Sequence, residues 1–114
     1  MSLPLDAATV LQALDLELDH EPVDPAEVVD GSPTTGLAEL TVWGGSEVGV
    51  WEITPGTVTA VEEAEVFIVL RGHATLRRGD GTTVELVAGS IGRLDEGEET
   101  SWTVHETLRK VYVA

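Results

Sequence analysis

Glu65 is the residue of this sequence whose position most clearly suggests chemistry. It stands directly before the apolar run Val66–Leu70, at a position where an apolar residue is expected. In a strand, Glu65 shares a face with Phe67 and Val69, so a barrel that encloses this face places the carboxylate near a pocket mouth. A carboxylate there can act as a general acid or base, and Glu65 is the candidate catalytic residue. The alternative is a structural role, in which Glu65 pairs with an arginine or with backbone amides at the barrel end.

The other residue types that commonly carry chemistry are few. The chain has no cysteine, and its three histidines are His20, His73 and His105. Thiol catalysis, thiolate ligands and disulfides are therefore excluded. The histidines are scattered along the sequence without a short metal-ligand spacing, and we expect His73 and His105 at the surface. These residues alone predict no metal site.

The charge of the chain limits its partners. Its 114 residues carry a formal net charge of −15, and all six basic residues follow Leu70. Such a charge repels polyanions, so we expect no binding to nucleic acid or to a membrane surface. The N-terminus lacks the charged and apolar segments of a secretory signal, and no apolar run is long enough to cross a bilayer. We therefore expect a cytoplasmic protein.

Short strands must position these side chains. After Gly36, runs rich in Val, Ile, Thr and Trp alternate with glycine and proline at spacings of about ten residues, which is typical of an antiparallel sandwich or barrel. The turn Gly79-Asp80-Gly81 predicts a hairpin. Because Val66–Leu70 is apolar on both faces, we expect it to be covered on both sides. The predicted strands are Leu37–Trp43, Val48–Thr54, Thr57–Val61, Val66–Arg71, Ala74–Arg78, Thr82–Val87, Ser90–Leu94, Ser101–Val104 and Arg109–Val113.

The first 36 residues differ from the rest of the chain in amino-acid composition and pattern. The segment Leu5–Leu18 combines helix formers with apolar residues at helical spacing, and Asp6 can cap a short helix that begins at Ala7. Prolines and glycines between Asp19 and Gly36 exclude a long regular element. We therefore predict an N-terminal arm with a short helix over residues 1–36, and one all-β domain over residues 37–114.

From Pro33 to Val113 the sequence resembles the cupin superfamily. The resemblance is to its small single-domain group, related to the cupin parts of ureidoglycine aminohydrolase and of the ethanolamine-utilisation cupins. It implies a double-stranded β-helix, the cupin jelly roll. The residues that carry it are Gly49-Val-Trp51-Glu, Pro55-Gly56, Glu65 seven residues before Gly72, Asp80-Gly81, Gly89, Gly97, Trp102 and Arg109-Lys-Val-Tyr112.

The metal ligands of the family are mostly missing here. Metal-binding cupins have two histidines shortly before the glutamate that corresponds to Glu65, and a third histidine in the second half. The matching positions fall within Val58–Val61 and at Thr100, and none is histidine. The resemblance therefore implies a metal-poor site without a cofactor. A weak divalent metal bound by Glu62, Glu63 and Glu65 stays open as an alternative.

The resemblance also identifies candidate pocket residues. Trp102 shares a face with Thr100 and is expected beside the pocket, whereas Trp51 is expected in the core or an interface. Of Arg109 and Lys110, one can reach inward toward a carboxylate while the other stays exposed. Arg93 can anchor an anionic ligand or pair with Glu65. The predicted ligand-binding residues are Glu65, Thr100, Trp102, Thr59, Val61 and Arg93.

Three functions are compatible with these features. The first is a metal-poor cupin that binds a small polar metabolite in its barrel. The second is a hydrolase acting on a C–N bond of a ureide-type substrate, with Glu65 moving protons. The third is a structural or regulatory homodimer, because small β-sandwiches commonly pair through edge strands or an arm.

Overall fold

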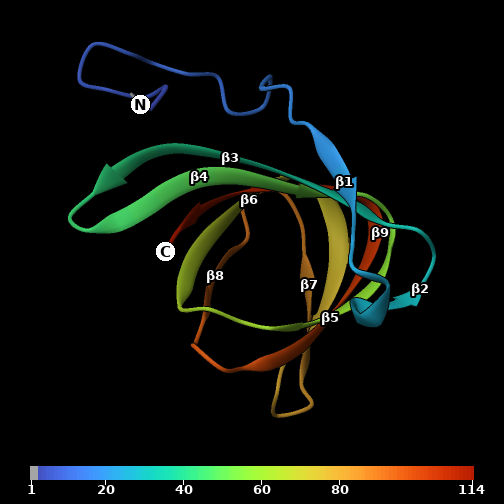
Figure 1. Ribbon diagram of the computed structural model, residues 1–114. Helices are drawn as coiled ribbons and strands as arrows, with labels where there is room; N and C mark the ends of the chain where they lie inside the picture. The colour runs from blue at the N-terminus through green and yellow to red at the C-terminus, as the bar shows by residue number, and fades with distance from the viewer. Residues whose placement is uncertain (1–2) are drawn as a thin grey trace.

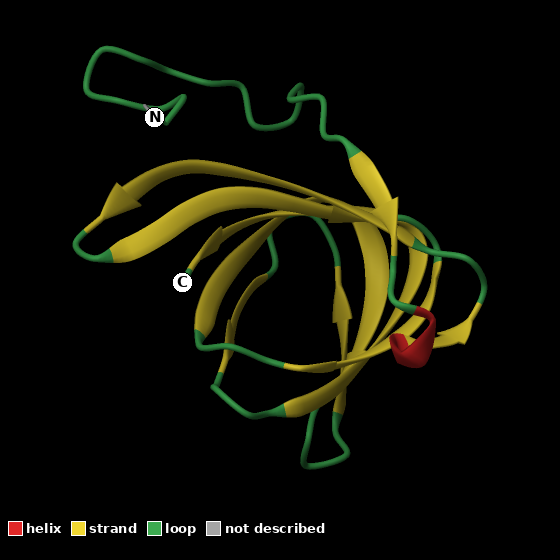
Figure 2. Ribbon diagram, viewed as in Figure 1, coloured by secondary structure: helices red, strands yellow, loops and turns green. Residues whose placement is uncertain are grey.

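The computed structural model describes residues 3–114 and is built almost entirely from β-strands (Figures 1 and 2). The helix within this range is a single 3₁₀ turn, η1 (Pro25–Glu27). The all-β prediction is confirmed. The strands are β1 (His20–Pro22), β2 (Val28–Asp30), β3 (Thr34–Trp43), β4 (Ser46–Ile53), β5 (Gly56–Val61), β6 (Glu65–Arg77), β7 (Thr83–Leu86), β8 (Ile91–Leu94) and β9 (Glu99–Val113).

Two long strands organise the sheet. β6 and β9 pair antiparallel along most of their lengths, and β4 and β5 pair one after the other with the free edge of β9. On the far edge of β6, β8 pairs with its first half and β7 with its second half. The sheet therefore curls around an enclosed interior (Figure 1). This is the predicted cupin jelly roll.

A corner at Gly72 lets β6 pass from one half of the barrel to the other. Gly72 has a φ of +99°, and a Cβ atom added there would lie 2.1 Å from the carbonyl oxygen of Thr107. The register with β9 shifts between Val69 and Ala74, as at a β-bulge. The two strands predicted around Gly72 are therefore one bent strand. In the same way, the last two predicted strands are both parts of β9.

The predicted hairpin is present between β6 and β7. The amide of Arg78 donates to Thr82 O at 2.8 Å, and the amide of Gly81 donates to Arg78 O at 2.9 Å. Gly81 supplies the positive φ that this turn requires. The hairpin therefore forms by the local turn chemistry that the sequence predicts.

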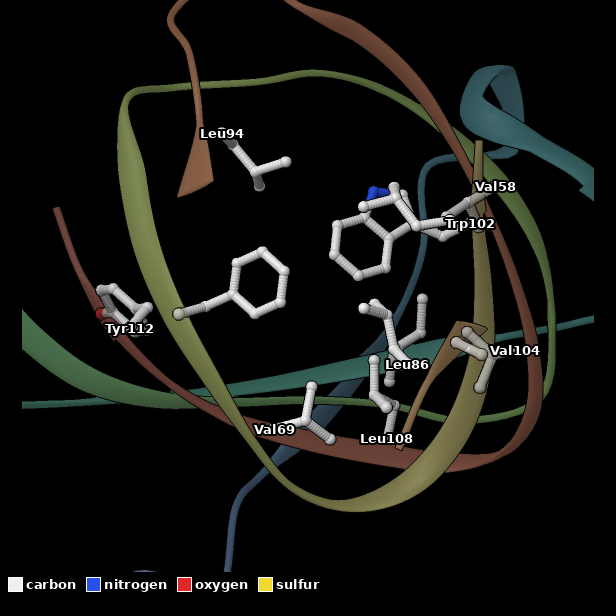
Figure 3. Packing of buried hydrophobic residues seen from close by; sticks show 12 residues of the cluster. Val58, Val69, Leu86, Leu94, Trp102, Val104, Leu108 and Tyr112 are labelled. Carbon is white, nitrogen blue, oxygen red and sulfur yellow. The ribbon is translucent and has the colours of Figure 1, made fainter. Parts of the chain in front are cut away.

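The barrel interior is an apolar core that surrounds Trp102. Figure 3 shows Trp102, Leu86, Val104 and Leu108 pointing into it from β7 and β9. Phe67 is also buried in this cluster, and a Cβ on Gly92 of β8 would lie 2.5 Å from its ring. The outer face of β6 is different, since Val66 and Ile68 are 45% and 42% exposed. The expectation that Val66–Leu70 is covered on both sides therefore fails for the single chain.

The predicted N-terminal helix is absent. Asp6 does cap a turn, because its carboxylate accepts from the Ala8 amide at 2.9 Å, but only this turn and a second one, in which the Asp15 amide donates to Gln12 O at 3.0 Å, form before β1. The amide of Leu5 donates to Leu40 O at 3.0 Å, so the arm runs along β3. Between the two turns its half-buried side chains alternate as in extended chain, rather than at helical spacing. The half-buried side chains of the whole arm are Leu3, Leu5, Thr9, Leu11, Ala13, Leu16 and Leu18.

Arg109 fixes the arm to the barrel. Its side chain points away from the barrel interior and is only 3% exposed, so the expectation that one of the two C-terminal cations stays exposed is wrong. Its Nη1 donates to Ala13 O at 2.8 Å, and its Nε donates to Glu52 Oε2 at 2.5 Å. Although burial opposes ionisation, the hydrogen bonds and charges of Arg109 and Arg71 hold the pKa of Glu52 below its usual value.

No helix within residues 3–114 has the length and apolar character needed to span a membrane.

Candidate functional site

A cleft of about 450 Å³ opens at one end of the barrel. Trp51 comes from β4, Glu65 from β6, and Trp102 and Lys110 from β9, while Glu62 lies in the loop between β5 and β6. Glu65 on β6 and Trp102 and Lys110 on β9 point to the same side of the sheet, so they all line this cleft. The remaining lining residues are Pro22, Val23, Asp24, Glu27, Thr35, Leu37, Glu47, Ile53, Val58, Thr59, Ala60, Glu63, Tyr112 and Ala114.

Lys110 lies at the centre of this site. Its ammonium is 4.7 Å from the ring centroid of Trp51, 4.9 Å from that of Phe67 and 5.0 Å from that of Trp102. Aromatic faces attract a cation at such distances. Lys110 Nζ also donates to Glu65 Oε2 at 2.5 Å, and both side chains are largely buried. Glu65 is therefore one half of a buried ion pair, and its partner is a lysine rather than an arginine.

Glu62 provides the second inward carboxylate. Hydrogen bonds from the Glu62 amide to Glu98 O and from the Gly97 amide to Glu62 O, both 2.8 Å, fix its backbone. Its Oε2 is buried and has no hydrogen-bond partner. Burial raises the pKa of Glu62, and the negative charge of Glu65 adds to this effect, whereas the charge of Lys110 and the polar side-chain groups of Thr100 and Trp102 oppose it. Glu62 is thus a half-buried residue whose Oε2 makes no hydrogen bond, while the polar groups of Thr100 and Trp102 lie beside its carboxyl.

Tyr112 closes the side of the cleft nearest the C-terminus. Its hydroxyl donates to Glu47 Oε2 across the β4–β9 pair. Burial raises the pKa of Tyr112, and its hydrogen bond to the Glu47 carboxylate acts in the same direction. A Cβ on Gly49 would lie 2.4 Å from the tyrosine hydroxyl, so the glycine makes room for this contact.

The structure brings together only some of the predicted site residues. Glu65, Trp102 and Thr59 line the cleft. Thr100 is buried beneath it, where its Oγ1 accepts from Trp102 Nε1 at 3.1 Å. Val61 is 72% exposed and lies, with Thr59 and Thr100, at a second hollow outside the cleft. Arg93 points to solvent and pairs with Asp95 at 3.0 Å rather than with Glu65.

Three residues of the site were not among those predicted to bind a ligand. Glu62 was expected only as a possible ligand of a weakly bound metal, Trp51 in the core or an interface, and Lys110 only as one of two possible inward cations. The inward orientation of Trp51 and Lys110 depends on how β4 and β9 pair, since these two residues are direct cross-strand partners. The alternation between Arg109 and Lys110 was the signal for an inward cation, but it could not say which residue turns inward.

The barrel interior does not fit the metal of the family. The positions of the paired histidines fall within Val58–Val61, which contains no histidine, and the Thr100 hydroxyl already accepts from Trp102. A transition metal requires three or four converging N, O or S ligands. Glu65 is engaged by an ammonium group, whose charge repels a second cation. Glu65 therefore binds the ammonium group of Lys110 where a metal-binding cupin has its metal ion.

Comparison with known proteins agrees with this fold. A structure of unknown function from Rhizobium leguminosarum bv. viciae 3841 is 26% identical with a TM-score of 0.63, over 69% of this chain and 78% of the other. A protein of the DUF861 family from Pseudomonas syringae pv. tomato str. DC3000 is 23% identical with a TM-score of 0.76, over 90% of this chain and 46% of the other. The Clostridium difficile EutQ protein is 19% identical with a TM-score of 0.63, over 81% of this chain and 73% of the other.

No functionally curated protein matches the chain in sequence. The EutQ-like cupin domain matches residues 41–112, which is more than half of the chain. This segment contains β4 to β8, the end of β3 from Thr41 onward and nearly all of β9, and with them Trp51, Glu62, Glu65, Trp102 and Lys110. The chain therefore belongs to the family of EutQ-like cupin domains.

Proposed function

We propose that this cupin domain binds a small polar metabolite that carries an amine, in the cleft between Glu62, Trp51 and Trp102. The observation that carries this proposal is the buried Oε2 of Glu62, which has no hydrogen-bond partner. Buried polar atoms are almost always paired, because an unpaired one costs about 1–3 kcal/mol. An N–H group of a ligand supplies the missing donor.

The charges of the cleft favour a cationic ligand. Six of its lining residues are acidic, and Lys110 balances only one of them, Glu65. Glu47 is occupied by the Tyr112 hydroxyl. The carboxylates near the opening, Asp24, Glu27 and Glu63, attract a cation and repel an anion. Trp51 and Trp102 present aromatic surface to the apolar part of the ligand or to its ammonium group.

A matched set of small molecules tests this proposal. Ethanolamine, ethylene glycol and glycolate have similar sizes, and the first is included because the sequence resembles the ethanolamine-utilisation cupins. Binding to the native state raises the unfolding temperature, so we expect a rise with ethanolamine or longer amines and none with glycolate. The rise must disappear in Glu62→Gln and persist in Glu96→Gln, which changes an exposed carboxylate outside the cleft. An equal response to all three compounds, or a preference for glycolate, contradicts the proposal.

A second candidate function is hydrolysis of a C–N bond of a ureide. It is favoured by the two inward carboxyls, because Glu65 is paired with a lysine while burial raises the pKa of Glu62. Two carboxyls in different environments can divide the roles of acid and base. Release of ammonia from ureidoglycine tests it, with Glu62→Gln and Glu65→Gln as variants. Absence of ammonia release, or release unchanged in both variants, rules out this assignment.

We also propose that the domain forms a homodimer. The outer surface of the barrel carries an apolar patch in which Val66 pairs with Val113 and Ile68 pairs with Ile91 across adjacent strands. Ile91 is 73% exposed, and the other three are each at least 40% exposed. Large exposed apolar patches commonly mark protein interfaces. A second copy of this chain offers the same apolar surface, related by a twofold axis.

A further inference from the structure

A second cluster of ligand-type side chains lies on the outer face of the barrel. His73 Nε2 is 2.8 Å from Glu85 Oε1, and the ring centroids of His73 and His105 are 4.6 Å apart. The candidate ligand atoms of these three residues all lie within 4.8 Å of one another. Thr75 Oγ1 lies between two of them, 3.0 Å from Glu85 Oε1 and 2.9 Å from His105 Nε2.

The sheet brings these residues together from three strands. Thr75 of β6 is the direct cross-strand partner of Glu85 on β7, and Ala74, with no exposed surface, faces the opposite side of β6. The register between β6 and β9 shifts on both sides of His73. Such a bulge redirects side chains, and here the His73 ring packs against that of His105 from β9 at an interplanar angle of 40°. The cluster therefore faces outward, away from the cleft.

We propose that His73, Glu85 and His105 bind a divalent transition-metal ion of the zinc class. Two imidazoles and one carboxylate are a ligand set that suits zinc, and a fourth position stays open to water. Ligand atoms around a tetrahedral zinc ion lie roughly 3.4 Å apart, given its bond lengths of about 2.1 Å. The present ligand atoms lie within 4.8 Å of one another, so the longer separations must shorten when the ion binds. The side chains are half-buried or exposed, so rotations of the rings and the carboxylate can bring the ligand atoms together.

Two further features support this site. The net charge of the chain is −15, which raises the local concentration of cations. The Thr75 hydroxyl can keep its hydrogen bond to Glu85 and so hold this carboxylate in place while the metal binds the imidazoles. The spacing of the two histidines along the chain does not indicate such a site, because the contact is made across the sheet and not within one segment.

Titration of the tag-free, chelator-treated full chain with zinc chloride, followed by calorimetry, tests the proposal. We expect one zinc ion per chain, and an affinity that falls at least about tenfold in His105→Ala and in Glu85→Gln. His20→Gln, which removes the third histidine of the chain, must leave the affinity unchanged, and so must Glu62→Gln in the cleft. Histidine ring resonances add a direct readout, since zinc is expected to shift those of His73 and His105 but not those of His20.

The proposal is overturned by the absence of zinc binding. It is equally overturned if zinc binds with unchanged affinity in His105→Ala, or if His20→Gln weakens binding as much as His105→Ala does. Thermal unfolding of each variant without zinc shows whether the fold is intact. His105 and Glu85 are exposed and lie outside the core, so their replacement is expected to leave the unfolding temperature nearly unchanged.

Discussion

The ammonium of Lys110 lies 2.5 Å from the carboxylate of Glu65 inside a ring of three aromatic side chains. Metal-binding cupins use the corresponding glutamate as a metal ligand, whereas this glutamate holds a cation from its own chain. The cationic group is thus covalently attached to the chain, whereas a bound metal ion can leave its site. The ion pair is part of the folded structure, so its removal changes stability as well as the charge of the cleft.

Lys110→Met is expected to destabilise the fold by about 3 kcal/mol, because it leaves the Glu65 carboxylate buried without its partner. Adding Glu65→Gln to this variant removes the unpaired charge, so the double variant is expected to be more stable than Lys110→Met alone. Urea unfolding of the wild type, both single variants and the double variant measures the coupling. If the changes in unfolding free energy of the two single variants add up to that of the double variant, the ion pair does not stabilise the protein.

Glu62→Gln is expected to stabilise the fold near neutral pH. Burial raises the pKa of Glu62 above 4.5, so the folded state holds this proton more tightly than the unfolded state does. The contribution of this raised pKa to the free energy of unfolding is fully present below pH 4.5, and it is lost as the pH rises through the folded-state pKa of Glu62. Urea unfolding is therefore expected to show a more stable variant at about pH 7.5 and no difference at about pH 4. Glu96→Gln, at an exposed site, is expected to show no such pH-dependent gain.

The jelly roll could be predicted because its signals are local. Alternating apolar residues and the Asp80-Gly81 turn specify strands and a hairpin without knowledge of distant contacts. The N-terminal segment was misread because leucines such as Leu11 and Leu18 fit a helical spacing, whereas the arm is extended along β3. Packing against an existing strand overrode the weak helix propensity of this segment.

The site was harder to predict because its geometry depends on how distant strands pair. Glu65 and Trp102 followed from strand alternation and from the family resemblance. The orientation of Lys110 depends on the register of β9 with β4 and β6, and the burial of Arg109 depends on an arm about a hundred residues earlier in the chain. The sequence pattern places side chains on alternate faces, but only the closed barrel determines which face is inside.

Ile68→Glu is expected to convert the proposed homodimer into a monomer. The change places a charge at the centre of the apolar patch formed by Val66, Ile68, Ile91 and Val113, where a second copy would bury it. Light scattering coupled to size-exclusion chromatography is expected to give twice the chain mass for the wild type and one chain mass for the variant. Val29→Glu, at another exposed apolar position on β2, is expected to stay dimeric. A wild type of one chain mass contradicts the proposed dimer.

Arg109→Lys is expected to loosen the N-terminal arm without unfolding the barrel. A lysine keeps the charge beside Glu52 but cannot donate from a planar fork to the carbonyls of Ala13 and Leu14 as well. Arg109→Met also leaves Glu52 without its closest partner and is expected to cost about 3 kcal/mol. Hydrogen exchange followed by mass spectrometry is expected to show faster exchange over residues 5–18 in both variants. In the lysine variant, protection of β6 and β9 is expected to persist, and an arm that exchanges at the wild-type rate would show that Arg109 does not hold it.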